Sequence, residues 1–209
     1  MPAWFDGRVD SNGECGVATL QRFRAPQSAG SNAVVWYTFA LGSVTVVTLS
    51  SEHSSAPDSA QGQFLERTLA AVDRSLTPWV VVTHHRHMYD AAGVETEVQA
   101  GFLAWLEPVF ARHGVDLVLM GHLHSAQRTC QVFNGTCTKG APMYVISGAS
   151  GATFGDWPVD PARASWVEYY DTRVNGFQVI DALNRTHLRI RFVRNHDMAV
   201  GDEAWVVKQ

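Results

Sequence analysis

The chain has 209 residues, enough for one sizeable domain, and its 46% hydrophobic and 17% charged composition is typical of a packed globular core. Its formal net charge of −4 shows no excess of positive charge of the kind that nucleic-acid binding needs. No apolar run reaches the roughly 20 residues of a membrane span. We therefore expect neither nucleic acid nor a membrane as a partner.

The amino-terminal part of the chain predicts an irregular segment followed by a hairpin. Residues 1–32 are rich in Gly, Ser and Pro and show no sustained period. Two short β-branched and aromatic runs follow, Val34–Phe39 and Ser43–Ser50, on either side of Gly42. This pattern predicts two strands that lead into a sheet.

The central part of the chain has the pattern of a β-α-β unit. The apolar runs Trp79–Thr83 and Asp116–Met120 predict buried strands, and a helical period from about Val98 to His113 lies between them. An earlier helix can be capped by Asp58 or Ser59. In such a unit the carboxyl ends of both strands lie at the same edge of the sheet.

The last third of the chain is predicted to be rich in β-structure. We expect a loop from Gly121 to Gly140, a buried strand at Met143–Ser147, and an antiparallel hairpin formed by Gly176–Ile180 and His187–Phe192. No repeat or second-domain boundary is evident. The prediction is therefore a single α/β domain with an irregular lead-in, an α/β part and a β-rich part (residues 1–32, 33–147 and 148–209).

Two histidine clusters follow the strands of the β-α-β unit. Residues 84–87 read His-His-Arg-His, and residues 121–124 read Gly-His-Leu-His. His122 and His124 are two apart, so both project to one side of an extended segment. With His85 at the neighbouring strand end, several imidazoles converge on one crevice, which favours a metal site over a pair of surface histidines.

The other polar residues near the strand ends receive supporting roles. His84 and His87 have the opposite parity to His85, so we interpret them as groups behind the ligands or at the crevice rim. Arg86 would support the local turn or attract anions. His53 follows another strand and could approach a substrate, although a structural role fits it equally well.

Three neutral imidazoles could hold a mononuclear zinc ion with one position open for water. A dinuclear hydrolase would need oxygen ligands as well. The acidic candidates near the strand ends, Asp90 and Asp156, fit no recognisable carboxylate motif.

Several features indicate a secreted origin. Asn134 and Asn184 begin glycosylation sequons. Cys130 and Cys137 could close a short disulfide loop, and Cys15 would then have no partner cysteine in this sequence. The first eight residues lack the pattern of a signal peptide, which taken literally predicts a cytoplasmic chain.

These segments resemble a known family. Thr83–Tyr89 resembles the G-H-R-P-M-Y segment of purple acid phosphatases, which are calcineurin-like metallophosphoesterases, and Gly121–Thr129 resembles their G-H-x-H-x-Y-E-R-T segment. Further similarities lie at Asp10–Val17, Leu49–His53 and Arg128–Cys137, so the likeness runs from about Asp10 to the carboxyl end.

The resemblance implies a role for each histidine. His85 matches a ligand of the divalent metal, His122 the further histidine of that metal, and His124 the histidine of the ferric site. It implies a calcineurin-like β-sandwich flanked by helices and a centre of Fe(III) with zinc, manganese or iron that hydrolyses phosphate monoesters. It also implies a location outside the cell or in the secretory pathway for the parent protein, and a homodimer of the full-length protein.

The chain also departs from the family pattern. The motifs D-x-G, G-D-x-x-Y and G-N-H-E have no counterpart before Asp10, so only three of the seven usual metal ligands are expected here. Ala126 and Gln127 replace Tyr-Glu of the second segment. We therefore expect a fold that is incomplete on its amino-terminal side, from a truncated gene product or an isolated carboxyl-terminal half. The rival interpretation is a non-catalytic fragment that binds metal through its histidines.

Overall fold

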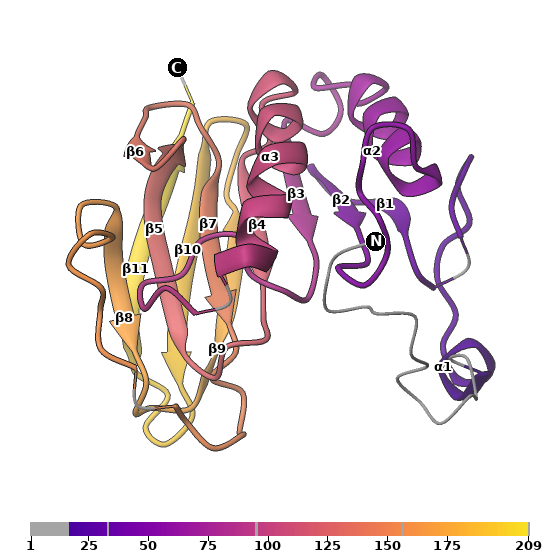
Figure 1. The fold of residues 1–209 in the computed structure, drawn as a ribbon. Coiled ribbons are helices and arrows are strands. Elements are labelled where there is room, and N and C mark those ends of the chain that lie inside the picture. Colours follow the sequence, from indigo (N-terminus) through magenta and orange to yellow (C-terminus); the bar gives the residue numbers. More distant parts are fainter. Residues whose placement is uncertain (1–16, 33, 95, 156, 209) are drawn as a thin grey trace.

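The structure is a computed structural model that describes residues 17–32, 34–94, 96–155 and 157–208 (Figure 1). Its larger sheet contains eight strands: β1 (Tyr37–Leu41), β2 (Val44–Thr48), β3 (Trp79–Thr83), β4 (Leu117–Met120), β5 (Ala126–Phe133), β6 (Thr136–Cys137), β7 (Met143–Ser147) and β8 (Val167–Asp171). The smaller sheet contains three strands: β9 (Gly176–Ala182), β10 (His187–Arg194) and β11 (Val200–Val207). The helices are α1 (Val17–Arg22), α2 (Ala60–Ala70) and α3 (Thr96–Arg112).

The larger sheet has a parallel centre and antiparallel margins. Its order is β1-β2-β3-β4-β7-β5-β6, and β8 also pairs with β5. Strands β2, β3, β4 and β7 are parallel neighbours, whereas β1, β5, β6 and β8 pair in antiparallel fashion. The smaller sheet is antiparallel throughout, in the order β11-β10-β9. Parallel central strands place the carboxyl ends of β3 and β4 at one edge, as the β-α-β pattern predicted.

Helices and the smaller sheet cover opposite faces of the larger sheet. Alternate residues of β3 show this division: Val80 and Val82 face a core with Phe64 of α2 and Phe110 of α3, whereas Val81 faces a second core with residues of β10 and β11. In Figure 1, α3 lies on one side of β3 and β4 and the smaller sheet on the other. The sequence of β3 is continuously apolar because both of its faces are buried. The predicted sandwich flanked by helices is confirmed.

The helices begin and end where capping chemistry allows. Ser59, not Asp58, is the N-cap of α2, and its hydroxyl accepts a hydrogen bond from the Gly62 N–H at 3.0 Å. After α3 the chain turns through Gly114, which has a φ of 61° that favours glycine. Within the described ranges, no helix combines the length and the apolar character that crossing a bilayer would need.

Some strands differ from the prediction. The segment Gly121–Gly140 was expected to be a loop, and this was wrong, because it contains β5 and β6. The middle of β5 is polar, yet Arg128 is buried and donates from Nε to Asp202 of β11 at 2.7 Å and from Nη1 to Glu168 of β8 at 2.6 Å. Strands β8 and β11 were also not predicted, and the lead-in contains the short helix α1.

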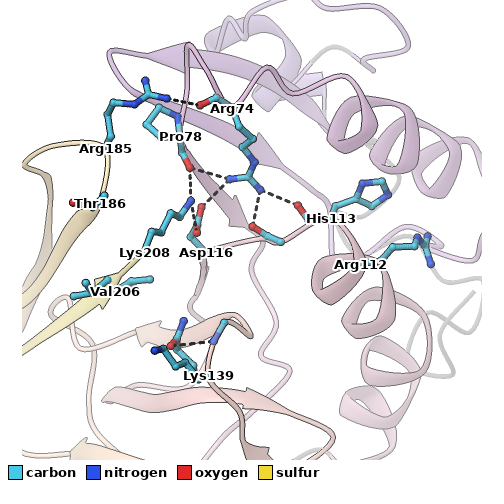
Figure 2. A pocket seen from close by; sticks show the side chains of 14 residues that line it. Arg74, Pro78, Arg112, His113, Asp116, Lys139, Arg185, Thr186, Val206 and Lys208 are labelled. Atoms are coloured by element: carbon cyan, nitrogen blue, oxygen red, sulfur yellow. Dashed lines mark hydrogen bonds and ion pairs between the residues drawn. The ribbon is translucent and has the colours of Figure 1, made fainter.

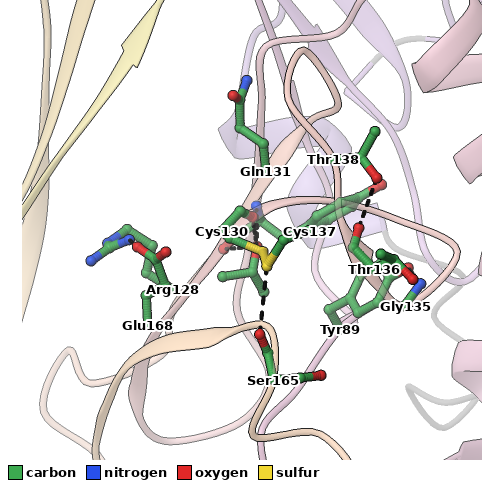
Figure 3. Close-up of a disulfide and its surroundings, with 12 residues drawn as sticks. Tyr89, Arg128, Cys130, Gln131, Gly135, Thr136, Cys137, Thr138, Ser165 and Glu168 are labelled. Carbon is green, nitrogen blue, oxygen red and sulfur yellow. Dashed lines mark hydrogen bonds and ion pairs between the residues drawn. A yellow bond between two sulfur atoms is a disulfide. The ribbon is translucent and has the colours of Figure 1, made fainter.

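The predicted disulfide is present between Cys130 of β5 and Cys137 of β6 (Figure 3). Their Cα atoms are 5.8 Å apart, and Val132 pairs with Cys137 in the ladder between the two strands. The disulfide therefore closes the tip of the β5–β6 hairpin. Cys15, the remaining cysteine, lies outside the described residues.

Loss of this disulfide is expected to lower the free energy of unfolding by about 2.5 kcal/mol, because the open loop regains conformational freedom in the unfolded chain. The test is urea denaturation of the oxidised chain, the reduced chain and the variant Cys130→Ser/Cys137→Ser. Reduction should lower the midpoint of the parent chain and leave that of the variant unchanged. Equal midpoints for the oxidised and reduced parent chain would contradict the expectation.

Candidate metal centre

The two histidine clusters follow adjacent parallel strands, as predicted. The ladder between β3 and β4 continues beyond the strands: the His84 N–H donates to the Leu119 carbonyl at 3.1 Å, and the Gly121 N–H donates to the His85 carbonyl at 2.9 Å. These bonds hold the segments that carry His85 and His122 side by side.

His85 and His122 meet directly through their rings. Nε2 of His85 lies 3.1 Å from Nδ1 of His122, and the ring planes are nearly perpendicular at 82°. Two imidazole nitrogens bound to one zinc ion at about 2.0–2.1 Å would be roughly 3.0–3.4 Å apart. The two nitrogens are hydrogen-bonded to each other in this structure, and their separation also falls within the range that one shared ion would give.

The backbone at His122 is unusual and helps to aim its ring. Its φ is 70°, a left-handed conformation that non-glycine residues adopt rarely. Such conformations persist where the surrounding structure fixes them, and they cluster at functional sites. Leu123, the next residue, is buried, with 3% of its surface exposed.

His124 is oriented by a backbone carbonyl. Its Nδ1 lies 2.7 Å from the carbonyl oxygen of Thr153. Because a carbonyl can only accept, Nδ1 carries the proton and Nε2 keeps the lone pair. Metal-bound histidines are typically held in this way through the second ring nitrogen. Among the residues that the structure describes, however, no three His, Cys, Asp or Glu side chains are placed to hold a metal ion by themselves.

The segment that carries His124 packs tightly on Gly148. A Cβ at this glycine would lie 1.7 Å from the Leu123 carbonyl oxygen, far inside any real contact. The Gly148 N–H also donates to the Ser125 carbonyl at 3.0 Å, so the two segments cannot separate without losing this bond. The small residues after β7 therefore position the second histidine cluster.

Gly148→Ala is expected to destabilise the chain by about 3 kcal/mol, because the added methyl group must push the Leu123 backbone away. Gly101→Ala is the matched control: a Cβ at this helical glycine meets nothing within 4 Å, and alanine is expected to stabilise the helix by about 0.5–1 kcal/mol. Denaturation midpoints of the two variants would measure the difference. Equal midpoints would show that the Leu123 segment yields freely.

His84 lies in the core rather than at the crevice rim. Its ring is 5% exposed and packs against Phe102 of α3, with ring centroids 5.6 Å apart. Burial lowers the pKa of His84 to about 4, and this outweighs the opposing effect of the Arg86 backbone. His84 is therefore neutral at physiological pH and acts as a packing residue.

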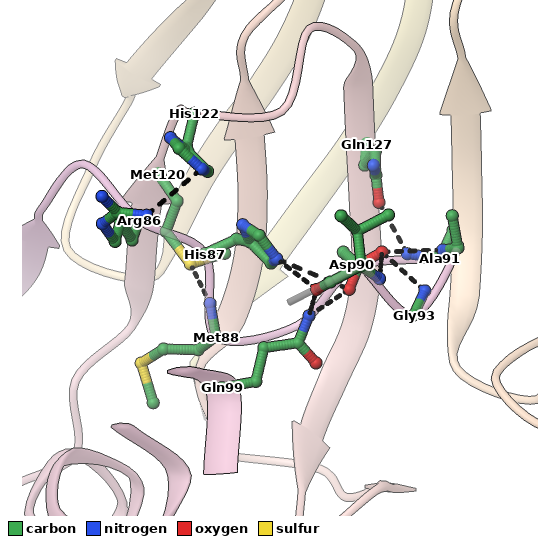
Figure 4. A network of polar contacts seen from close by, with 12 residues as sticks. Arg86, His87, Met88, Asp90, Ala91, Gly93, Gln99, Met120, His122 and Gln127 are labelled. Carbon is green, nitrogen blue, oxygen red and sulfur yellow. Dashed lines mark hydrogen bonds and ion pairs between the residues drawn. The ribbon is translucent and has the colours of Figure 1, made fainter. Parts of the chain in front are cut away.

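His87 lies behind His122. It is fully buried, and its ring stacks on that of His122 with centroids 5.8 Å apart and planes at 18° (Figure 4). Its Nε2 lies 2.9 Å from the Val94 carbonyl and 3.7 Å from the Asp90 carboxylate. His87 therefore lies behind His122 and away from the crevice rim, the first of the two positions that its parity allowed.

Asp90 is a buried residue whose role the sequence did not reveal. Oδ1 accepts from the Ala92 and Gly93 N–H groups at 2.8 Å each, and Oδ2 accepts from the Gln99 amide. Arg163 donates to the Asp90 carbonyl at 3.1 Å. The only sequence signal was the turn composition of Asp-Ala-Ala-Gly at 90–93. The network fixes the loop that follows His87 (Figure 4).

Arg86 is paired with Glu52, a residue to which the sequence assigned no role. Arg86 Nε donates to a Glu52 carboxylate oxygen at 2.8 Å, and its Nη1 lies 3.4 Å from Nε2 of His122. The charged pair borders the histidines. His53 is exposed, and the described contacts of its ring are with Ser50, at 2.8 Å from Nδ1, and with the edge of Trp36.

The remaining predicted positions are on the surface or outside the description. The side chains of Asn134 and Asn184 are exposed, as glycosylation would require. Asp156 lies outside the described residues, and so do residues 10–16 of the segment Asp10–Val17 that resembles the family.

Comparison with known proteins identifies the family. Residues 141–203, from just before β7 into β11, match the family model described as Iron/zinc purple acid phosphatase-like protein C. A protein named probable inactive purple acid phosphatase 9, from Arabidopsis thaliana, is 31% identical over 92% of this chain and 33% of its own length. Purple acid phosphatase 1 from Ipomoea batatas is 29% identical over 92% of this chain and 44% of its own length.

The fold agrees with these relatives. The structure of a purple acid phosphatase from yellow lupin (Lupinus luteus) seeds matches with a TM-score of 0.82 and 25% identity, covering 97% of this chain and 37% of that one. The chain thus spans between a third and a half of the length of these relatives. Because the strand-end histidines, the sandwich and the sequence matches agree, the chain belongs to the purple acid phosphatase-like family and corresponds to a carboxyl-terminal part of its metallophosphoesterase fold.

Proposed function

We propose that this chain supplies the carboxyl-terminal part of a dinuclear metal centre that hydrolyses phosphate monoesters. The observation that carries the proposal is the 3.1 Å separation of His85 Nε2 and His122 Nδ1 at the ends of two parallel strands. Two imidazole nitrogens at this separation can bind one ion, and imidazole suits zinc and iron. His85 and His122 would hold the divalent ion, which is zinc, manganese or iron, and His124 the Fe(III).

When bound, two adjacent cations neutralise the charge of the phosphate ester and stabilise the attacking and leaving oxygens. The described residues would prepare this site. The Thr153 carbonyl keeps the proton of His124 on Nδ1, and the stacked ring of His87 limits the rotation of His122. Arg86 places a cation, balanced by Glu52, beside the same ring.

The surroundings proposed for the parent protein are extracellular or secretory. The disulfide between Cys130 and Cys137 supports this, since disulfides persist in oxidising compartments. Glycosylation at the exposed Asn134 and Asn184 and a homodimer of the full-length protein belong to the same proposal. Its substrate partner is a phosphate monoester.

A comparison of the purified chain with the variant His122→Ala/His124→Ala tests the proposal. Metal content and hydrolysis of p-nitrophenyl phosphate would be measured after loading with iron and zinc. Because the chain holds three of the seven expected ligands, we expect the parent chain to bind metal that the variant does not bind, and any hydrolysis to be confined to the parent chain. Equal hydrolysis by both chains would exclude these histidines from catalysis.

A second candidate function is a non-catalytic metal-binding module. Two observations favour it: the described residues include no group of three placed to hold a metal ion, and three relatives from Arabidopsis thaliana are named probable inactive. Such a module would bind metal through its histidines alone, without the oxygen ligands that the family resemblance implies. Metal binding that the double variant loses, without hydrolysis by either chain, would select this module.

A further inference from the structure

A large basic pocket lies at the edge of the sheet opposite the histidine clusters (Figure 2). Its volume is about 950 Å³, and Pro78 and Asp116, which precede β3 and β4, form part of its wall. The end of α3 and the end of β11 also line it. His85 and His122 follow the carboxyl ends of the same two strands, so this pocket is a separate site.

The pocket concentrates positive charge in an acidic protein. Its lining contains five lysine and arginine side chains, Arg74, Arg112, Lys139, Arg185 and Lys208. One lining carboxylate, Asp116, opposes them, and Glu66 pairs with Arg112 at 2.7 Å from outside the lining. Three formal positive charges therefore remain in this region, whereas the whole chain has a net charge of −4.

The buried Asp116 holds two of the lining cations in place. One carboxylate oxygen accepts from Arg74 Nη1 at 2.9 Å, and the other accepts from Lys208 Nζ at 2.7 Å. Nη2 of Arg74 donates to the carbonyls of His113 and Gly114 at 2.8 and 2.6 Å. The guanidinium thus covers the carbonyl oxygens that follow α3, which would otherwise repel an anion. Both cations are held in place before any ligand arrives.

Arg185 and Lys139 lie at the rim. Nη1 and Nη2 of Arg185 donate to the backbone carbonyls of Ser75 and Arg74 at 2.7 and 3.2 Å, and Figure 2 shows this side chain reaching across to the Arg74 segment. The charge of Arg185 also acts on Asp73, but the two form no ion pair. Lys139 makes no hydrogen bond or ion pair with any residue that the structure describes. Both rim cations therefore keep a charge that a carboxylate does not neutralise.

The shape and composition of the pocket select the kind of anion. Guanidinium groups match the geometry of phosphate oxygens, and a pocket of this size suits a small molecule rather than a single ion. The lining has no Phe, Tyr or Trp on which a nucleobase could stack, and its one imidazole, His113, is tied to Glu66 at 2.9 Å outside the lining. We propose that this pocket binds a compact anion with several phosphate groups and no aromatic base, either an inorganic polyphosphate or a multiply phosphorylated sugar.

Isothermal titration calorimetry on the metal-free chain tests the proposal, with sodium tripolyphosphate and fructose 1,6-bisphosphate as the two probes. We expect one molecule of at least one probe to bind per chain. The probe that binds more tightly shows whether the natural ligand is an inorganic polyphosphate or a phosphorylated sugar. Lys139→Gln/Arg185→Gln should weaken binding about tenfold or more, since each hydrogen bond to a charged group is worth about 1.5–3 kcal/mol.

Arg24→Gln/Arg173→Gln is the matched control, because it removes the same charge from exposed positions outside the pocket. It should bind as the parent chain does. If the double pocket variant unfolds, Lys139→Gln alone keeps the test valid, since Lys139 contributes no described polar contact. Absence of binding, equal weakening by the control, or loss of binding in His85→Ala/His122→Ala would overturn the proposal.

Discussion

Replacement of His122 by alanine is expected to weaken Zn²⁺ binding by the metal-free chain about 100-fold or more. His122 Nδ1 and His85 Nε2 are 3.1 Å apart, so one ion can bind both nitrogens, and the variant leaves a single imidazole. Loss of a residue that only orients a ligand typically lowers metal affinity 10–100-fold. Loss of one of the two ligands themselves should lower the affinity further. Competition titration against a chelator of known affinity would measure the dissociation constant.

His187→Ala is the matched control for this titration. His187 is an exposed histidine on β10, and its described ring contacts are with Thr186 and Trp205. Its removal should leave the zinc affinity unchanged. If both variants bound zinc like the parent chain, the ring contact between His85 and His122 would be no more than packing.

Trp79→Ala is expected to lower the free energy of unfolding by about 3–5 kcal/mol, the largest stability effect that we predict. Trp79 begins β3, is fully buried between the two sheets, and donates from Nε1 to the Asn184 carbonyl at 2.8 Å. The ammonium group of Lys208 also lies 4.3 Å from its ring centroid. The variant would open a cavity and remove contacts that join the smaller sheet to the larger one.

Trp205→Ala provides the comparison for Trp79, because it removes the same side chain from a position that is 41% exposed. This variant should lower the free energy of unfolding by less than about 1 kcal/mol. Urea denaturation of both variants would measure the two values. Similar values would mean that the smaller sheet does not depend on the core around Trp79.

The strands that could be predicted from the sequence are those whose own residues show a clear apolar pattern. Strands β3 and β7 are continuous apolar runs because both of their faces are buried. Strand β5 was missed because Arg128 is buried and paired with Asp202, a residue of β11 far along the chain. Strand β11 was missed because its first half contains Gly201, Asp202 and Glu203, residue types that are depleted in strands.

In the candidate site, too, the contacts that depend on distant segments could not be predicted. The meeting of His85 with His122 could be predicted, because parallel strands bring their carboxyl ends to one edge. The burial of His84 against Phe102 and the bonds from Gln99 and Arg163 to Asp90 could not, since they depend on how α3 and distant loops pack. Periodicity within one strand reports which side a residue faces, not what lies there.

Anomalous diffraction from crystals of the chain soaked in Zn²⁺ would show directly whether His85 and His122 bind one ion. We expect an anomalous peak about 2.0–2.1 Å from both His85 Nε2 and His122 Nδ1. Zinc bound only at other histidines, such as His113 or His187, with none between this pair, would exclude a shared site.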